Sequence, residues 1–377
     1  MVMNMYRKQE QPQILAEIAY MPQLDSIRAV AVGLVVLLHW VPGQGVLWLR
    51  GSSGVHLFFV ISGFLITSIL LTAREKSTDQ KRFQIVRRFY MRRALRIFPL
   101  YYLLILFALF IGIEDVADSF PWHFFYGTNF FIAFKGEYHG FVTHFWSLAA
   151  EEQFYLLWPT LVLFLPMARL GGLFVGVVIF GIGFNALGIG MGWFSSHFGY
   201  YFPAWSFSFM GMGALFAFWR FQCVQGVGAP WKGLFLEKLP ILGLMGALLL
   251  TLYYFQTGGE VPKSVWGIFI YNTLYMLTLA SVVVAAGKTI KGPVGAVLMF
   301  PPFRYIGRIS YGIYLLHPFV ITGVNLLFNH YGYSIMEIFG PIGRMLFLVS
   351  ILILITSLSW FAFETPINRL KRFVPYH

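Results

Sequence analysis

Apolar runs of about 20 residues recur from one end of this 377-residue chain to the other. A helix of that length crosses the hydrocarbon core of a bilayer with every backbone group bonded inside the segment. Only 11% of the residues are charged, against about 25% in soluble domains. The sequence therefore predicts an all-α polytopic integral membrane bundle of about ten transmembrane helices. The expected spans are 26–46, 54–73, 97–113, 145–165, 171–190, 199–219, 237–256, 263–286, 305–328 and 342–363.

The distribution of the 27 lysine and arginine residues predicts the orientation of the bundle. An even number of spans places both termini on one side, and all but four of these residues then fall on that side; the four are Arg50, Lys135, Lys263 and Arg344. Because positive charge is retained in the cytoplasm, both termini are predicted to be cytoplasmic. Membrane orientation also accounts for the net charge of +12, so nucleic acid is not an expected partner.

The chain divides into three parts by composition. Residues 1–23 are polar and lack the apolar centre of a cleavable signal peptide, so they are expected to form a cytoplasmic N-terminal segment. Residues 24–369 form the membrane domain, and 370–377 a cytoplasmic tail. The single cysteine, Cys223, excludes an intramolecular disulfide and a thiolate metal cluster. No cluster has metal-ligand spacing, so no metal is expected.

The segment LDSIRAVAVGLVVLLHWVP carries the first candidate site residues. Arg28 and His39 are 11 residues apart, which places them within roughly 20° of one helix face and about 16 Å apart. A histidine deep in an apolar span is costly and is therefore a functional candidate. The alternative is a neutral imidazole that only bonds across the bundle.

The basic segment between Arg74 and Arg96, expected as a cytoplasmic loop, ends in RRFYMRRALRIFP. Three of its arginines, Arg92, Arg93 and Arg96, fall within about a 100° arc of a helix, just before Pro99, which is expected to start or kink the third span. One reading is a phosphate clamp, because arginine grips phosphate oxygens in pairs. The other is a contact with anionic lipid headgroups.

Two further segments place polar groups at the entrance of an expected span or within one. In HFWSLAAEEQFYLLWP, Glu151 and Tyr155 are neighbours on one helix face, whereas Glu152 points elsewhere. Carboxylates at the entrance of a span line a cavity or meet a buried cation. In the ninth span Ser310, Tyr314 and His317 share a face, and His317 stands at the depth of His39.

The remaining signals concern packing. Ser62 and Gly63, in GVHLFFVISGFLIT, predict a close helix contact. His56 near the outer end of that span has a structural and a functional reading. Glu364, at the end of the last span, is expected to form a structural ion pair. The outer loop 114–143 contains PWHFFYGTNFF, an expected interfacial or re-entrant aromatic piece.

Five blocks in order resemble the acyltransferase-3 family of integral membrane O-acyltransferases, which O-acylate polysaccharides and other glycosyl acceptors. They are LDSIRAVAV with His39, GVHLFFVISGFLIT, RRALRIFP, FWSLAAEEQFYLLWP and SYGIYLLHP, and the resemblance runs from Leu24 to about Arg369. One position departs from the family pattern. An aspartate usually follows Gly-Val in the second block, and His56 stands there in this chain.

The resemblance implies transfer of an acyl group, acetyl being the commonest, from cytoplasmic acyl-CoA to a hydroxyl of a glycan or glycosylated acceptor in the bacterial inner membrane. It implies His39 as general base, with a covalent acyl-histidine as the alternative. Glu151 and Arg28 are the other two expected catalytic residues, and Arg92, Arg93, Arg96 and Arg28 would bind acetyl-CoA. The acceptor side would comprise Glu152, Ser310, Tyr314, His317, Tyr155 and His56. Some relatives carry an extracytoplasmic hydrolase-like extension; if acyl transfer needs such a domain, a separate extracytoplasmic partner is expected to supply it.

Two other functions compete. A proton-coupled transporter or flippase of a glycan or lipid-linked intermediate would also use intramembrane histidines, but no clear inverted repeat or matched pair of broken spans is present. An inactive sensor or scaffold would retain the fold without needing His39. Thermal stabilisation by coenzyme A thioesters would favour the enzyme.

Overall fold

The structure is a computed structural model that describes residues 21–41, 51–78, 81–136 and 142–374, together with Leu49 and Gly140. Ten helices of at least 19 residues lie within these ranges, and each overlaps one expected span. Seven of them are long and apolar enough to cross a membrane, by length and composition. The ten are α2 (Pro22–Trp40), α3 (Gly51–Glu75), α4 (Arg82–Phe110), α8 (Phe145–Phe164), α9 (Met167–Gly190), α11 (Pro203–Val224), α12 (Pro230–Thr257), α13 (Val265–Gly287), α16 (Ser310–His330) and α17 (Ile335–Ser359).

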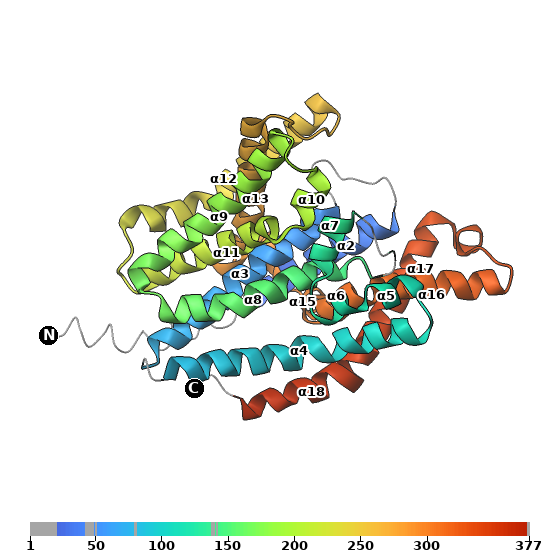
Figure 1. Cartoon of the computed structure of the whole chain (residues 1–377). Helices are drawn as coiled ribbons and strands as arrows, with labels where there is room; N and C mark the ends of the chain where they lie inside the picture. Colours follow the sequence, from blue (N-terminus) through green and yellow to red (C-terminus); the bar gives the residue numbers. More distant parts are fainter. Residues whose placement is uncertain are drawn as a thin grey trace.

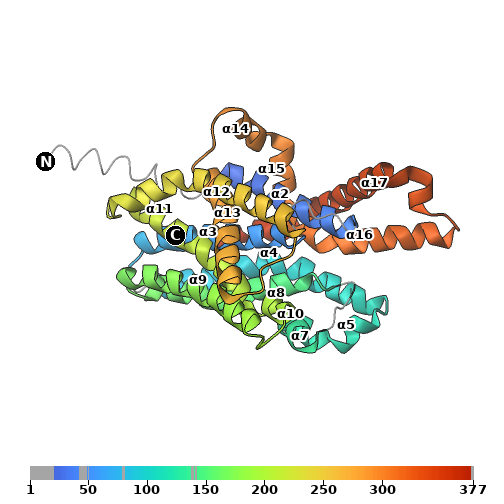
Figure 2. The ribbon, with the colours of Figure 1, turned by 90° about the horizontal axis from the view of Figure 1, so that it is seen from above.

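The three long helices outside that set of seven are α2, α8 and α11, and they lie mainly inside the protein. Helix α3 occupies the centre and packs against α2, α8, α11 and α13. Helices α16 and α17 run side by side as a hairpin at one end of the molecule (Figures 1 and 2). Polar side chains of α2 and α8 can therefore face one another in the interior, where other helices separate them from lipid. The fold is that of an all-α, multi-pass membrane protein.

Glycine allows the backbones of α3 and α11 to touch. A side chain at Gly63 would collide with the backbone of Met210, and one at Gly213 would collide with the backbone of Val60. Small residues at such crossings are the usual means of close helix packing in membranes, where no water is released to drive association. The close contact predicted at Gly63 is confirmed.

Helix α4 differs from the sequence-based expectation. It begins at Arg82 and keeps Pro99 in its interior, so most of the expected loop between Arg74 and Arg96 is helical. Proline inside a helix removes one hydrogen bond, here to the carbonyl of Leu95. The helical geometry fixes the relative directions of the arginines in this segment, as described below.

Short helices complete the chain. Those between the long helices are α5 (Glu114–Asp118), α6 (Phe120–Phe124), α7 (Thr128–Lys135), α10 (Ser196–Tyr201), α14 (Gly292–Met299) and α15 (Pro301–Arg308). The aromatic piece of the outer loop forms α6 and α7. After α17 follow η2 (Trp360–Glu364), α18 (Thr365–Arg369) and η3 (Leu370–Phe373). Most of the N-terminal segment (1–20), Arg50 and residues 375–377 of the expected tail lie outside the described residues.

Candidate active site

Three imidazole rings meet at one cavity, which we call the histidine cavity. His39 stands near the end of α2, His317 lies in α16, and His144 immediately precedes α8. The ring centroid of His317 is 5.0 Å from that of His39 and 5.2 Å from that of His144. The cavity has a volume of about 560 Å³, which is within the range that holds small ligands.

Backbone carbonyls determine which nitrogen of each ring carries hydrogen. His39 Nδ1 lies 2.8 Å from the carbonyl oxygen of Val35, and His317 Nδ1 lies 2.7 Å from that of Tyr314. His144 Nε2 lies 3.2 Å from the carbonyl oxygen of Leu315. Since a carbonyl only accepts, each of these nitrogens must donate, and the opposite nitrogen of a neutral ring carries a lone pair. The cavity thus gathers three imidazoles, each with an acceptor nitrogen.

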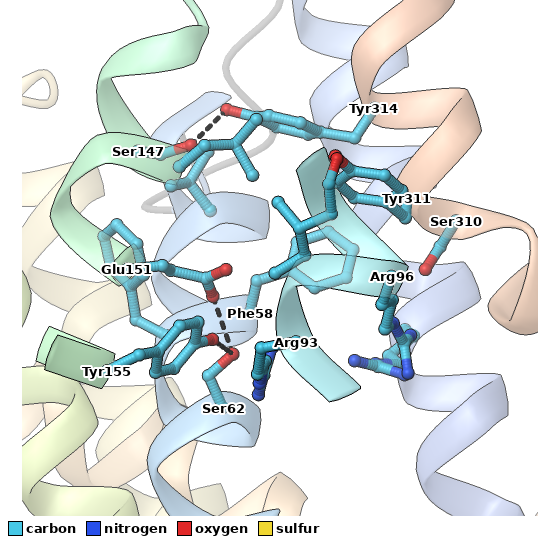
Figure 3. A pocket seen from close by; sticks show the side chains of 15 residues that line it. Phe58, Ser62, Arg93, Arg96, Ser147, Glu151, Tyr155, Ser310, Tyr311 and Tyr314 are labelled. Carbon is cyan, nitrogen blue, oxygen red and sulfur yellow. Dashed lines mark hydrogen bonds between the residues drawn. The ribbon is translucent and has the colours of Figure 1, made fainter. Parts of the chain in front are cut away.

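A second cavity, the middle cavity, contains a chain of hydrogen bonds (Figure 3). Tyr155 donates from its hydroxyl to Ser62 Oγ at 2.9 Å, and Ser62 donates to Glu151 Oε1 at 2.6 Å. The guanidinium of Arg93 lies 3.9 Å from the centroid of the Tyr155 ring, a cation–π contact. Arg28, Arg96 and Ser310 also line this cavity. Tyr155, Ser62 and Glu151 thus position one another within this cavity.

A third cavity, the arginine cavity, has a volume of about 290 Å³. Four basic side chains line it against two acidic ones, Asp25 and Glu364. Asp25 lies 3.8 Å from Arg308, and Glu364 accepts a hydrogen bond from Ser359. The excess of positive charge suits an anionic ligand. The four basic residues are Arg28, Arg96, Arg308 and Lys371.

The three cavities form a row because neighbouring ones share lining residues. Arg28, Arg96 and Tyr311 line both the arginine cavity and the middle cavity. Val55 and Tyr314 line both the middle cavity and the histidine cavity. Helix α2 runs along the row, with Arg28 near one end and His39 at the other.

The structure distributes the sequence-predicted site residues unevenly. It brings nine of the twelve to this row: His39, Tyr314 and His317 at the histidine cavity, with Arg28, Arg93, Arg96, Glu151, Tyr155 and Ser310 around the middle cavity. The other three, Arg92, Glu152 and His56, are absent from the described lining of all three cavities.

Each of these three has another environment. Arg92 donates to the carbonyl oxygens of Lys371 at 3.1 Å and Val374 at 3.0 Å, so it fastens the C-terminal residues to α4. Glu152 faces a separate cavity between α4 and α8, where its Oε1 lacks a hydrogen-bond partner among the described residues. His56 is buried, bonded to the Tyr275 hydroxyl at 3.0 Å and stacked on an aromatic ring of α11.

Sequence reasoning did not single out His144, Tyr311 or Lys371. His144, Ser147 and Glu151 are spaced by three and four residues, the spacing of one helix face, and this signal could have grouped them. Lys371 carries no comparable signal, because it reaches the arginine cavity only through the path of the short helical segments that follow α17. Within the described residues, no group of three or more histidine, cysteine or acidic side chains is placed to hold a metal ion.

Basic side chains line one end of this internal row of cavities and imidazoles line the other, so the membrane bundle has a polar interior. The sequence model of the acyltransferase-3 family, described as an acyltransferase domain, matches residues 21–364. The chain belongs to this family, as its five blocks indicate.

Three relatives show what the chain is similar to. It is 30% identical to the peptidoglycan O-acetyltransferase OatA of Listeria monocytogenes, over 93% of this chain and 56% of the relative. It is 28% identical to a putative O-acetyltransferase of Staphylococcus aureus, over 93% and 58%. It is 26% identical to the putative peptidoglycan O-acetyltransferase YrhL of Bacillus subtilis, over 93% and 55%. The chain thus spans little more than half the length of these relatives, and no solved structure matches it.

Proposed function

We propose that this protein is an O-acetyltransferase of the bacterial plasma membrane that moves an acetyl group from cytoplasmic acetyl-CoA to a glycan hydroxyl on the outer face. The observation that carries the proposal is the row of three cavities, with cations at one end and imidazoles at the other. The family and the O-acetyltransferase relatives support the reaction class. Peptidoglycan, named for two of those relatives, is the acceptor we favour.

The arginine cavity is the proposed entry site of the donor. Coenzyme A carries several phosphate charges, and arginine–phosphate hydrogen bonds are short and strong. Arg28 and Arg96 line both this cavity and the middle cavity, so they can bind phosphate while the thioester arm extends inward. Arg28 Nε is buried and lacks a hydrogen-bond partner among the described residues, which leaves a donor for such a ligand. This assignment requires both termini to be cytoplasmic, as the charge distribution predicts.

His39 is the proposed general base. With Nδ1 bonded to its own helix, Nε2 can accept the proton of an acceptor hydroxyl in the histidine cavity. The hydroxyl oxygen bonds to the acetyl carbonyl carbon, the carbon–sulfur bond breaks, and the proton passes from His39 to the sulfur. Coenzyme A then leaves as the free thiol. His317 and His144 are proposed to bind and orient the acceptor.

Glu151 is proposed as a positioning residue. Its carboxylate is bonded to Ser62 and lies close enough to Arg28 for electrostatic attraction. Glu151 is therefore proposed to position Arg28 rather than the imidazole rings. Breaking this chain of bonds should reduce donor affinity more than it reduces the affinity for the acceptor.

The proposal is tested with full-length protein in membrane vesicles supplied with labelled acetyl-CoA and soluble peptidoglycan fragments. Acetate in ester linkage on the sugar, together with release of the coenzyme A thiol, is the expected result. Movement of the glycan across the membrane without thiol release would instead establish a transporter and overturn the proposal. If thiol release occurs but the label remains on the protein, the enzyme holds a covalent intermediate awaiting a separate transfer partner.

A further inference from the structure

Two side chains separate the middle cavity from the histidine cavity. Val55 of α3 and Tyr314 of α16 are the residues that line both cavities. Both are almost entirely buried, with 5% and 6% of their surface exposed. They therefore lie at the border where the row passes from the middle cavity to the histidine cavity. We call this pair the septum.

The tyrosine of the septum is held by the start of α8. Its hydroxyl oxygen lies 2.6 Å from Ser147 Oγ (Figure 3) and 2.9 Å from the carbonyl oxygen of His144. Ser147 Oγ lies 3.2 Å from the same carbonyl, so the two hydroxyls and the carbonyl form one hydrogen-bonded group. The ring of Phe58 lies 6.3 Å from the Tyr314 ring and supports its other side. These contacts hold the Tyr314 side chain of the septum in position.

The space on the donor side of this wall is small. The middle cavity has a volume of about 60 Å³, whereas the histidine cavity has about 560 Å³. The smaller volume holds roughly four to six water molecules. An acetyl thioester places four non-hydrogen atoms (sulfur, carbonyl carbon, oxygen and methyl) in this space together with the end of its arm, so each added methylene must displace packed side chains.

We propose that Val55 and Tyr314 act as a size filter that restricts the transferred acyl group to acetyl. This inference rests on the proposed acyl-CoA donor and specifies which residues select the acyl group of that donor. The thioester carbonyl reaches the septum from the middle cavity, and its alkyl end must fit between the valine and the phenol ring. The larger histidine cavity places no such limit on the acceptor.

The magnitude of selection follows from pocket chemistry. One methylene in an apolar pocket changes the specificity constant by about 10- to 200-fold. The intact septum should therefore prefer acetyl-CoA over propionyl-CoA by about that factor. Removing the two methyl groups of Val55 opens room for about one methylene and should reduce the preference at least tenfold.

The experiment compares thiol release from acetyl-, propionyl- and butyryl-CoA by full-length protein in vesicles with peptidoglycan fragments. Val55→Ala is the test variant. Val60→Ala is the matched control, because it makes the same change at a buried site of the same helix outside the described lining of the three cavities. The expected result is a propionyl-to-acetyl ratio raised at least tenfold by Val55→Ala and unchanged by Val60→Ala.

A second variant, Val55→Ile, narrows the septum and should lower the ratio, so the filter is testable even where Val55→Ala fails to accumulate. A ratio that neither Val55 variant changes, while acetyl-CoA is still consumed, overturns the filter and leaves the acetyltransferase intact. Failure of the unsubstituted protein to consume any acyl-CoA overturns the donor assignment, and the filter with it.

Discussion

The ring centroids of His39 and His317 lie 5.0 Å apart, although the two residues belong to the first and ninth expected spans. Each ring donates from Nδ1 to a carbonyl of its own helix. These hydrogen bonds fix the same tautomer in both neutral rings, with the hydrogen on Nδ1 and Nε2 as the acceptor. The two acceptor nitrogens, on different helices, can each accept a hydrogen bond from the same hydroxyl group at different stages of the proposed reaction.

Replacing His39 by glutamine should lower the acetyl transfer rate by about 10²- to 10⁴-fold, the contribution of a general base. Its ring is hydrogen-bonded to a carbonyl of its own helix and not to another helix among the described residues, so the protein should still accumulate and bind coenzyme A. Initial rates in vesicles and thermal shift with coenzyme A check both parts. Full activity in this variant would remove His39 from the mechanism.

His317→Gln should raise the KM for the glycan acceptor more than it lowers kcat, because the buried Nε2 of His317 is proposed to bind that acceptor. His330→Gln is the control on the same helix, at an exposed position beyond the cavity. Steady-state kinetics over a range of acceptor concentrations measures the two constants. A loss confined to kcat would instead assign His317 to proton transfer.

Arg96→Gln and Arg92→Gln should have different consequences. Arg96 lines the arginine cavity, so its loss should weaken coenzyme A binding by about tenfold or more, in line with the 1.5–3 kcal/mol of a charge-assisted hydrogen bond. Arg92 holds the C-terminal residues, including Lys371 of the arginine cavity, so its loss should lower the Tm and weaken coenzyme A binding less than the loss of Arg96. Equilibrium binding and thermal unfolding in detergent separate the two effects. Equal loss of affinity in both variants would contradict the cavity assignment.

Gly63→Ala should prevent accumulation of folded protein, because the added methyl group would enter the backbone of Met210. Gly33→Ala, at a helical site where nothing lies within 4 Å, should be tolerated. Quantitative detection of the protein in membranes, with its Tm in detergent, tests this pair. Normal stability of the Gly63 variant would mean that α3 and α11 do not touch at this point.

Much of the fold could be predicted because its signals are local. Ten apolar runs of helical length appear as ten long helices, and Gly63 marks a close crossing. The pattern of one helix also showed that Glu151 and Glu152 point in different directions, and these two carboxylates do line different cavities, whereas Tyr155 borders both. The start of α4 at Arg82 was not predicted, because Pro99 was expected to start or kink the third span. In the structure Pro99 lies inside the helix.

The sequence by itself determined the class of fold, the family and the residues that share a face on each helix, because hydrophobic length and the 3.6-residue period are properties of a continuous segment. Only the tertiary structure decided which faces meet. It joined His144 to His39 and His317, sent Arg92 toward the C-terminal residues and Arg96 toward a cavity, and enclosed His56 among aromatic rings. These relationships depend on contacts between helices distant in the chain, and no local period encodes the distance between two such helices.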